Sequence, residues 1–456
     1  MHRTVVIDIV GLTPELIGDH TPHLRAFAQD GAMRPMETVF PAVTCSVQAS
    51  LTTGLMPRDH GIVGNGWYAR DLAEVMFWKQ SNHLVSGEKI WDAAVKRDPS
   101  FTTAKLFWWY NMYSTANWSV TPRPIYWADG LKLPDIYCEP PALRDALVGA
   151  LGEFPLFDFW GPRASIASSK WIAECARFVY DQRKPSLSLV YLPHLDYDLQ
   201  RLGPTDPGIG PALEAIDAVA GELIAHVRKD GARVIVLSEY GITPVRGAIH
   251  VNRALREAGL LRVRLEQGLE KLDPGASDAF AVADHQIAHV HVRRRELLGP
   301  VAELLARLPG VEAVLDDAGK ASHGIDHARA GDLVLVSAAD RWFTYYYWLD
   351  DELAPEYART VDIHRKPGYD PVELFVDPSL PSPQLTAAIT LAKKKLGFRY
   401  LMSLIPLDAS LVKGSHGRLT TDPRKGPLVM TSEPELLTGA SIHATEVKAL
   451  VLRHLF

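Results

Sequence analysis

Three acidic side chains stand at or just beyond the ends of apolar runs, where they could bind a metal ion together. Asp8 interrupts the first run, Asp196 follows Leu-Pro-His-Leu after the second, and Glu239 follows Leu-Ser after the third. One carboxylate in such a place is usually a cap or turn residue. Three are harder to dismiss, because packed carboxylates repel one another unless a cation lies among them.

Thr44 is the candidate nucleophile. It stands before Cys45–Thr53, which is typical of a helix ending at Gly54. In one interpretation the hydroxyl only caps the helix, and local sequence alone favours this. In the other, it lies at the positive helix end, which suits a phosphoryl group, and a metal ion makes it a nucleophile. Cys45 is the rival nucleophile, but no Cys–His arrangement accompanies it.

Short β-branched runs alternate with helical patterns along the chain. The runs are Thr4–Val10, Leu187–Leu192, Arg233–Leu237 and Asp332–Val336, and helical patterns at Ser168–Gln182, Gly210–Lys229 and Pro300–Leu308 precede the last three. This alternation predicts an α/β fold with a mostly parallel central sheet and helices on both faces. Carboxyl ends of parallel strands share one edge, so the three acidic residues are predicted to meet there.

Aromatic-rich or irregular stretches interrupt this pattern. They include the runs Phe107–Tyr110 and Trp342–Trp348. We interpret the stretches as segments covering the site, although ordinary surface loops are an equal alternative for any one of them. The predicted division is a catalytic core of residues 1–240, 300–340 and 385–456, which includes an insertion near 66–160, and cap segments at 243–299 and 341–384.

Composition narrows the class of protein. The chain has 456 residues, 47% of them apolar, and a net charge of -6, which does not favour a polymeric nucleic acid or an acidic membrane as partner. Three cysteines without a CxxC pair argue against a disulfide framework. The first residues read as a strand, not a signal peptide, and no apolar stretch reaches the roughly 18 residues of a membrane span. We expect a cytoplasmic protein with no membrane partner and leave the oligomeric state open.

The order of these motifs resembles that of the alkaline phosphatase superfamily, in the branch of nucleotide pyrophosphatase/phosphodiesterases and phosphonoacetate hydrolases. The stretch Ala49–Asn65 (ASLTTGLMPRDHGIVGN) is similar to the helix and turn after the nucleophile in that branch. The resemblance implies an alkaline phosphatase-like fold and a substrate-binding role for Asn65. The corresponding positions here are Asp8 in VVIDIVGL, Thr44, Asp196, Glu239 in SEYG and His416 in GSHGR.

Three positions depart from the family pattern. The family has His four residues after its second Asp, where this chain has Gln200, and it has Asp-His where this chain has Glu239-Tyr240. The resemblance then implies two metal sites: Asp8, Thr44, Glu239 and possible ligand Tyr240 in one, and Asp196, His416 and possible ligand Gln200 in the other. An oxygen-rich set favours Mn or Mg over Zn, with iron possible through a tyrosine ligand. We expect one or two divalent ions.

Other residues could replace the lost imidazoles. His364 is the best candidate, because Arg365, Lys366 and a Pro-Gly turn beside it resemble a loop aimed at an anion, so both cations are candidate substrate-binding residues. Strand alternation puts His289 and His291 on one face, although a solvated face is the simpler interpretation. Further candidates are His194, Asp198, Asp284, His285, His323, Asp326 and His327.

These residues predict metal-dependent hydrolysis of a small phosphate ester through a phospho-threonine intermediate. Aromatic segments above the site favour a phosphodiester or pyrophosphate over a bare monoester. Two alternatives stay open within the same core: a metal-dependent phosphomutase or phosphotransferase, and a phosphonate or sulfate hydrolase. A non-enzyme alternative is a binding protein whose site has decayed, motivated by Gln200 and Tyr240.

Overall fold

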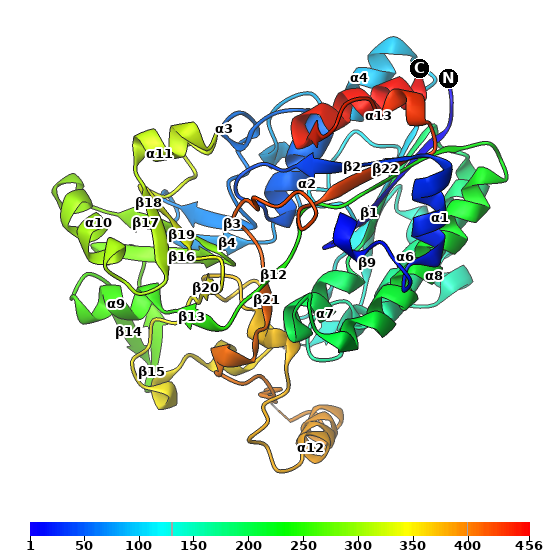
Figure 1. Ribbon diagram of the computed structural model, residues 1–456. Coiled ribbons are helices and arrows are strands. Elements are labelled where there is room, and N and C mark those ends of the chain that lie inside the picture. Colours follow the sequence, from blue (N-terminus) through cyan, green and yellow to red (C-terminus); the bar gives the residue numbers. More distant parts are fainter. Residues whose placement is uncertain (129–130, 399) are drawn as a thin grey trace.

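The computed structural model describes residues 1–128, 131–398 and 400–456. Residues 129–130 of the predicted insertion and residue 399 of the predicted core lie outside the described residues. The chain forms a nine-stranded central sheet and, beside it, a smaller four-stranded sheet (Figure 1).

The five strands β11, β1, β10, β5 and β6 at the middle of the central sheet run parallel to one another, and antiparallel pairs occur toward both edges. This confirms the predicted α/β fold with a mostly parallel central sheet. In spatial order the strands are β23 (Ile442–His443), β2 (Ala32–Glu37), β22 (Leu428–Thr431), β11 (Arg233–Leu237), β1 (Thr4–Ile9), β10 (Leu187–Leu192), β5 (Thr103–Leu106), β6 (Trp118–Pro122) and β9 (Ile136–Glu139).

Helices cover both faces of this sheet (Figure 1). The predicted helices at Ser168–Gln182 and Gly210–Lys229 correspond to α6 and α8. One face carries α1 (Pro22–Asp30), α5 (Ala142–Leu151), α6 (Ile166–Arg183), α7 (His194–Leu202) and α8 (Gly210–Arg228). The other carries α2 (Thr44–Thr53), α4 (Ile90–Arg97) and α13 (Val447–Leu455).

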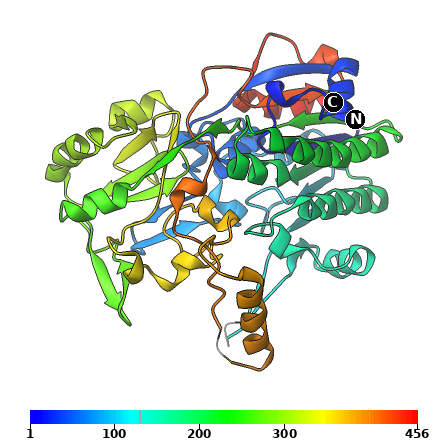
Figure 2. The same ribbon diagram turned by 60° about the horizontal axis from the view of Figure 1, so that its bottom comes forward.

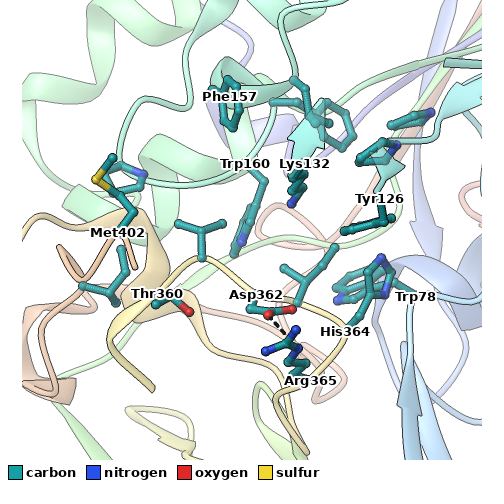
Figure 3. A pocket seen from close by; sticks show the side chains of 18 of the residues that line it. Trp78, Tyr126, Lys132, Phe157, Trp160, Thr360, Asp362, His364, Arg365 and Met402 are labelled. Atoms are coloured by element: carbon teal, nitrogen blue, oxygen red, sulfur yellow. Dashed lines mark ion pairs between the residues drawn. The ribbon is translucent and has the colours of Figure 1, made fainter. Parts of the chain in front are cut away.

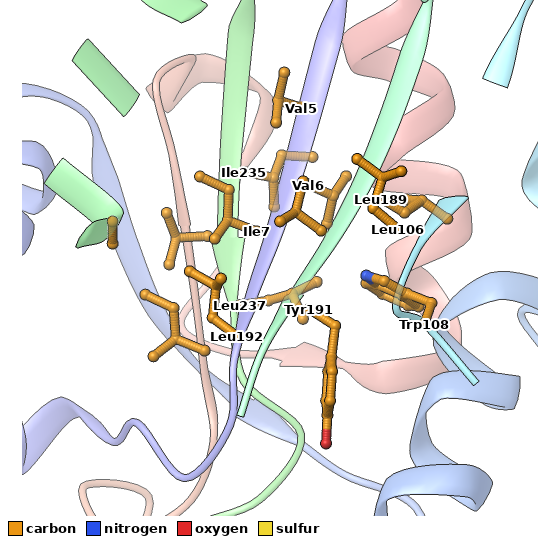
Figure 4. Packing of buried hydrophobic residues seen from close by; sticks show 14 of the residues in the cluster. Val5, Val6, Ile7, Leu106, Trp108, Leu189, Tyr191, Leu192, Ile235 and Leu237 are labelled. Atoms are coloured by element: carbon orange, nitrogen blue, oxygen red, sulfur yellow. The ribbon is translucent and has the colours of Figure 1, made fainter. Parts of the chain in front are cut away.

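The central strands are mostly apolar and largely buried because both of their faces are covered. Figure 4 shows Val6, Leu189 and Ile235 of three adjacent strands packed side by side. Each of these side chains is almost fully buried. The strands are therefore rigid supports for the residues at their carboxyl ends.

The fourth predicted run, Asp332–Val336, does not join the central sheet. It forms β19 (Leu333–Ser337), which pairs antiparallel with β17 and β18 in the four-stranded sheet. The predicted core segment 300–340 therefore contributes to the second sheet. That sheet and its surroundings comprise β16 (Ala279–Asp284), β17 (Ile287–Val292), β18 (Val311–Leu315), α9 (Val251–Glu257), α10 (Leu298–Ala306), α11 (Asp317–Ser322) and the pairs β13 (Gly247–Ile249) with β20 (Arg341–Phe343) and β14 (Val263–Glu266) with β15 (Leu269–Leu272).

The aromatic run Trp342–Trp348 packs in the core of this second unit and not over the site, since its aromatic side chains are almost completely buried.

The helix α12 (Pro383–Lys395) projects away from both sheets (Figure 2). The remaining elements are α3 (Pro57–His60) and the pairs β3 (Gly66–Ala69) with β4 (Glu74–Phe77), β7 (Ile125–Tyr126) with β8 (Lys132–Leu133), and β12 (Thr243–Pro244) with β21 (Gly414–Ser415).

The packing of the central strands predicts a large effect of truncating Leu189. We expect Leu189→Ala to lower the free energy of unfolding by about 2–5 kcal/mol, because it leaves a cavity between covered strands. Urea unfolding followed by circular dichroism measures this. Leu72→Ala is the matched control, since Leu72 is 58% exposed, and equal effects of the two substitutions would contradict this account of the core.

Candidate active site

The three acidic residues predicted at the strand ends come together in the structure. Asp8 lies in β1 and is in register with Tyr191 of β10 and Leu237 of β11. Glu239 follows β11 by two residues, and Asp196 lies in the first turn of α7 after β10. All three carboxylates are buried at one edge of the sheet.

Asp8 and Glu239 form a pair of neighbouring carboxylates bridged by Gln48 of α2. The Gln48 amide nitrogen donates to Glu239 Oε1 at 2.6 Å and to Asp8 Oδ2 at 3.4 Å. Burial raises the pKa of Asp8 well above its usual range, and the negative charge of Glu239 raises it further. Burial also raises the pKa of Glu239. The pair is therefore costly to ionise without a compensating positive charge.

The Thr44 hydroxyl contacts Tyr240, which connects it to Asp196. Thr44 Oγ1 lies 3.1 Å from the hydroxyl of Tyr240, which donates to Asp196 Oδ1 at 3.3 Å. The capping interpretation of Thr44 is wrong: the N-cap of α2 is Val43, and no side chain accepts there as a cap. Burial raises the pKa of Asp196 to about 7.

Gln200 holds Asp196 in place. Its amide nitrogen donates to Asp196 Oδ2 at 2.6 Å, and its amide oxygen accepts from the Tyr369 hydroxyl at 3.1 Å. Both polar ends of the side chain are thus occupied. In this arrangement Gln200 orients the Asp196 carboxylate and has no unpaired oxygen directed at a metal ion.

Four aromatic rings are stacked beside Asp196. Tyr240 stacks on His416 with a centroid distance of 3.5 Å, His416 lies 3.7 Å from His285, and His285 lies 3.7 Å from Tyr369. His416 Nδ1 donates to the Ala42 carbonyl, and burial lowers the pKa of His416 to about 3. The imidazole is therefore neutral, and its Nε2 carries a lone pair 3.9 Å from Asp196 Oδ1.

Sequence reasoning underrated His285. It lies in the turn of the β16–β17 hairpin with a φ of +62°, in the left-handed region that few residues other than glycine adopt. This turn carries the imidazole from the second sheet into the cluster. A periodicity argument for a strand cannot show this, because the chain reverses at His285. Gln48 and Tyr369 were also missed; a glutamine within the helix Cys45–Thr53 was the available signal.

The arrangement fits a cation by the atoms it leaves unpaired. Asp8 Oδ1, Glu239 Oε2 and His416 Nε2 are buried without a hydrogen-bond partner, and each offers a lone pair. Within the described residues, however, no group of three or more His, Cys, Asp and Glu side chains is placed to hold a metal ion. The hydroxyls of Thr44 and Tyr240 would therefore have to complete any ligand set.

Several predicted site residues lie apart from the cluster. The Asn65 side chain accepts from the Cys45 N–H and donates to Asp284, so its polar atoms are used inside the fold. Lys366 is 1% exposed and forms 2.8 Å ion pairs with Asp370 and Glu373, which excludes the predicted substrate contact.

His364 and Arg365 line the cavity above the cluster. The His364 Nδ1 lies 3.4 Å from the Phe77 carbonyl, and Arg365 pairs with Asp362 at 3.3 Å (Figure 3). Arg365 thus remains a candidate for a substrate contact, whereas no described contact joins His364 to the cluster.

The other candidate histidines are engaged elsewhere. His289 donates to the Val63 carbonyl and accepts from the Gly331 N–H. His291 packs against Tyr68 and Phe280. The remaining contacts are local: His194 with Asp198, His323 with Gly319, His327 with Arg329, and Asp326 with Arg58.

Cys45 is not an activated nucleophile. Burial raises the pKa of its thiol well above the usual range, so the reactive thiolate is disfavoured. All three cysteines are free and buried, as expected for a chain without a disulfide framework.

A cavity of about 2460 Å³ opens above the cluster and reaches Thr44, Asp196, Tyr240 and His416. Its walls are rich in aromatic rings, and the rings of Trp78 and Trp109 lie 4.7 Å apart. Figure 3 shows part of this lining. The aromatic residues that come from the insertion near 66–160 are Trp78, Trp109, Tyr113, Tyr126, Phe157, Phe159 and Trp160.

Comparison with known sequences gives one family match and one curated relative. The profile of the type I phosphodiesterase/nucleotide pyrophosphatase family matches residues 4–370. An uncharacterised pyrophosphatase/phosphodiesterase of Schizosaccharomyces pombe is 24% identical over 254 residues, which cover 53% of this chain and 44% of the relative. The chain therefore spans less than half the length of that relative.

Solved structures with the same fold include two relevant proteins. The fold is similar to that of phosphonoacetate hydrolase from Sinorhizobium meliloti in complex with phosphonoformate, with a TM-score of 0.64, 16% identity and coverage of 100% of this chain and 96% of that chain. It is also similar to an inactive murine ectonucleotide pyrophosphatase/phosphodiesterase 5 in complex with AMP, with a TM-score of 0.58, 14% identity and coverage of 100% and 95%. These likenesses confirm the alkaline phosphatase-like fold.

The Asp8–Glu239 pair predicts opposite effects of Glu239→Gln with and without metal. In metal-free protein the substitution removes one of two repelling buried charges, so we expect the melting temperature to rise by about 2 °C or more. Added Mn²⁺ or Mg²⁺ should stabilise the wild type more than the variant. Thermal unfolding after dialysis against a chelator measures both effects. Glu153→Gln, at an exposed carboxylate, is the control, and a wild type insensitive to both ions would contradict the prediction.

Proposed function

This chain belongs to the type I phosphodiesterase/nucleotide pyrophosphatase family, and on that basis we propose that it hydrolyses phosphodiesters or pyrophosphates with a divalent metal ion and a phosphothreonine intermediate on Thr44. The observation that carries this proposal is the contact of the Thr44 hydroxyl with Tyr240, beside Asp196, at the floor of the cavity. The adjacent N-terminus of α2 favours an anionic phosphoryl group.

The unpaired atoms of Asp8, Glu239 and His416, together with the oxygens beside them, indicate which residues would hold metal. Asp8, Glu239 and Thr44 would hold one ion. Asp196, His416 and Tyr240 would hold a second. When bound, such ions supply positive charge that offsets the buried carboxylates and stabilises the phosphoryl oxygens. One nitrogen among mostly oxygen donors favours Mn²⁺ or Mg²⁺ over Zn²⁺.

The hydrogen bonds give the Thr44 proton a route. Because the Tyr240 hydroxyl donates to Asp196, its oxygen lone pair faces Thr44 Oγ1 and can accept the Thr44 hydrogen. As Thr44 attacks phosphorus, the proton moves to Tyr240 while the Tyr240 proton moves to Asp196. The new O–P bond replaces the bond to the leaving group, while the other substituent stays on phosphorus. Water then hydrolyses this substituted phosphothreonine and releases the monoester.

The cavity favours a bulky leaving group. Trp78 and Trp109 present flat apolar surfaces on which a base or aryl group can stack, and Arg365 adds a cation at the wall. Related proteins have been solved with AMP, phosphonoformate and phosphonoacetate, which supports a small phosphorus-containing anion as ligand. A cavity of about 2460 Å³ is much larger than a bare phosphonate requires, so a diester or pyrophosphate is favoured over phosphonoacetate.

Replacing the nucleophile tests the proposal. We expect Thr44→Ala to lower kcat on bis-p-nitrophenyl phosphate by at least about 10³-fold, because no other group forms the covalent intermediate. Acid quench followed by mass spectrometry should find a p-nitrophenyl phosphate group on Thr44 of the wild type, because one aryl group leaves in the first step and the other stays on phosphorus. Release of p-nitrophenyl phosphate, without transfer of this group to added alcohols, separates hydrolysis from phosphotransfer.

Two neighbours on α2 are matched controls for Thr44. Ser46→Ala removes a buried hydroxyl from the same helical turn, and Cys45→Ala removes the rival nucleophile. Both variants should retain wild-type activity within a few-fold. Undiminished activity of Thr44→Ala, or loss of activity in Cys45→Ala alone, would contradict the mechanism.

Tyr240→Phe tests the proton route. The substitution keeps the ring that stacks on His416 but removes the hydroxyl between Thr44 and Asp196. We expect kcat to fall roughly 10²-fold, because the variant loses both the hydroxyl of the proton route and an oxygen that would help to hold the second ion. Steady-state kinetics with the same diester measures this, and an unchanged kcat would exclude Tyr240 from the route.

A further inference from the structure

The helix α12 has no buried residue, although much of its sequence is apolar. Leu385 is 59% exposed, Leu396 just after the helix is 73% exposed, and Ile389 between them is also exposed. An isolated helix of this length is only marginally stable in water, and most helices gain stability by packing an apolar face. The exposed face of α12 therefore lacks a partner.

The two sides of α12 have different surroundings. Gln384, Ala387, Leu391 and Lys394 recur at helical spacing and line the cavity that leads to Thr44. Leu385, Ile389, Ala392 and Leu396 recur at the same spacing on the opposite side and are exposed. The helix is thus a wall of the cavity whose outer side is an apolar stripe.

The charge of this segment opposes that of the whole protein. No acidic residue occurs between Asp377 and Asp408, whereas Lys393, Lys394 and Lys395 follow one another at the end of α12. In the described part of the chain, none of these three lysines forms an ion pair with a carboxylate. The net charge of the protein is -6, so this is a local cationic site on an acidic molecule.

We propose that the outer side of α12 forms a docking surface for an anionic lipid bilayer. Leu385, Ile389 and Leu396 enter the headgroup region while Lys393 and Lys395 contact lipid phosphates. Binding is peripheral, since no helix in the described residues has the length and apolarity to cross a bilayer. This differs from the sequence-based expectation of no membrane partner, which rested on net charge and on the lack of a membrane-spanning stretch and did not consider local charge.

A second copy of the chain fits the surface less well. A two-fold contact through α12 brings the same patch of each copy together, so the lysine run of one copy would meet that of the other. Nothing acidic on the segment 378–407 offsets that repulsion. An anionic lipid bilayer fits both features, because its interior can bury the apolar stripe and its phosphates can contact the lysines.

Vesicle sedimentation tests the surface with the full-length protein. We expect the wild type to sediment with phosphatidylcholine vesicles that contain about one third phosphatidylglycerol, but not with pure phosphatidylcholine vesicles. Lys393→Glu/Lys395→Glu should weaken partitioning about tenfold or more. Leu385→Ser/Ile389→Ser should weaken it to a similar extent. High salt should release the wild type.

Matched variants elsewhere control for non-specific effects. Lys170→Glu/Lys229→Glu makes the same change in charge at exposed lysines of α6 and of the end of α8. Leu72→Ser/Leu349→Ser removes two other exposed leucines. Both controls should bind as the wild type does, and all variants should hydrolyse a soluble diester as the wild type does.

Three outcomes would overturn the proposal. They are a wild type that binds neither kind of vesicle, control variants that lose binding as strongly as the α12 variants, and a wild-type dimer in sedimentation velocity that Leu385→Ser/Ile389→Ser abolishes without any vesicle binding. The last outcome would assign the face to a second copy. None of these results depends on turnover, so they leave the proposed hydrolysis to its own test.

Discussion

The burial of Asp8 beside Glu239 is the constraint on which the rest of the site depends. Two carboxylates in a dry interior repel each other and lose their hydration, which costs several kcal/mol unless positive charge or hydrogen bonds offset it. Here a single amide, that of Gln48, contacts both, and one oxygen of each carboxylate stays unpaired. The fold tolerates this because Asp8 is fixed in a strand paired on both sides, with Glu239 just beyond its neighbour.

The same constraint connects the site to the segments around it. The Gln48 amide oxygen accepts from the Trp109 backbone N–H at 2.7 Å, which orients the amide nitrogen toward the two carboxylates. The position of a cavity-lining tryptophan is therefore coupled to the buried charges. On the other side, the His285 turn of the second sheet stacks on His416. The central sheet, the aromatic insertion and the second sheet thus each supply one wall, and no single element contains the site.

The sequence predicted the strands that are buried on both faces of the central sheet. The apolar run Thr4–Val10 could only be interpreted as such a strand, and its acidic residue, Asp8, was therefore expected near the end of the strand. Asp332–Val336 was placed in the wrong sheet because a covered antiparallel strand looks the same as a covered parallel one. His285 and Lys366 were misjudged for another reason: a reversal of the chain and a buried ion pair depend on distant partners, which local pattern does not contain.

The departures from the family pattern argue for a rebuilt site and not for decay. A side chain left behind by lost function would be expected to have no specific partners. Tyr240 instead contacts Thr44 and Asp196 through its hydroxyl and His416 through its ring, and Gln200 uses both ends of its amide on Asp196 and Tyr369. The atoms that do lack partners in the cluster include carboxylate oxygens and an imidazole nitrogen, the groups that a cation attracts. The replaced residues therefore complete a hydrogen-bonded network beside the carboxylate oxygens and the imidazole nitrogen that still lack partners.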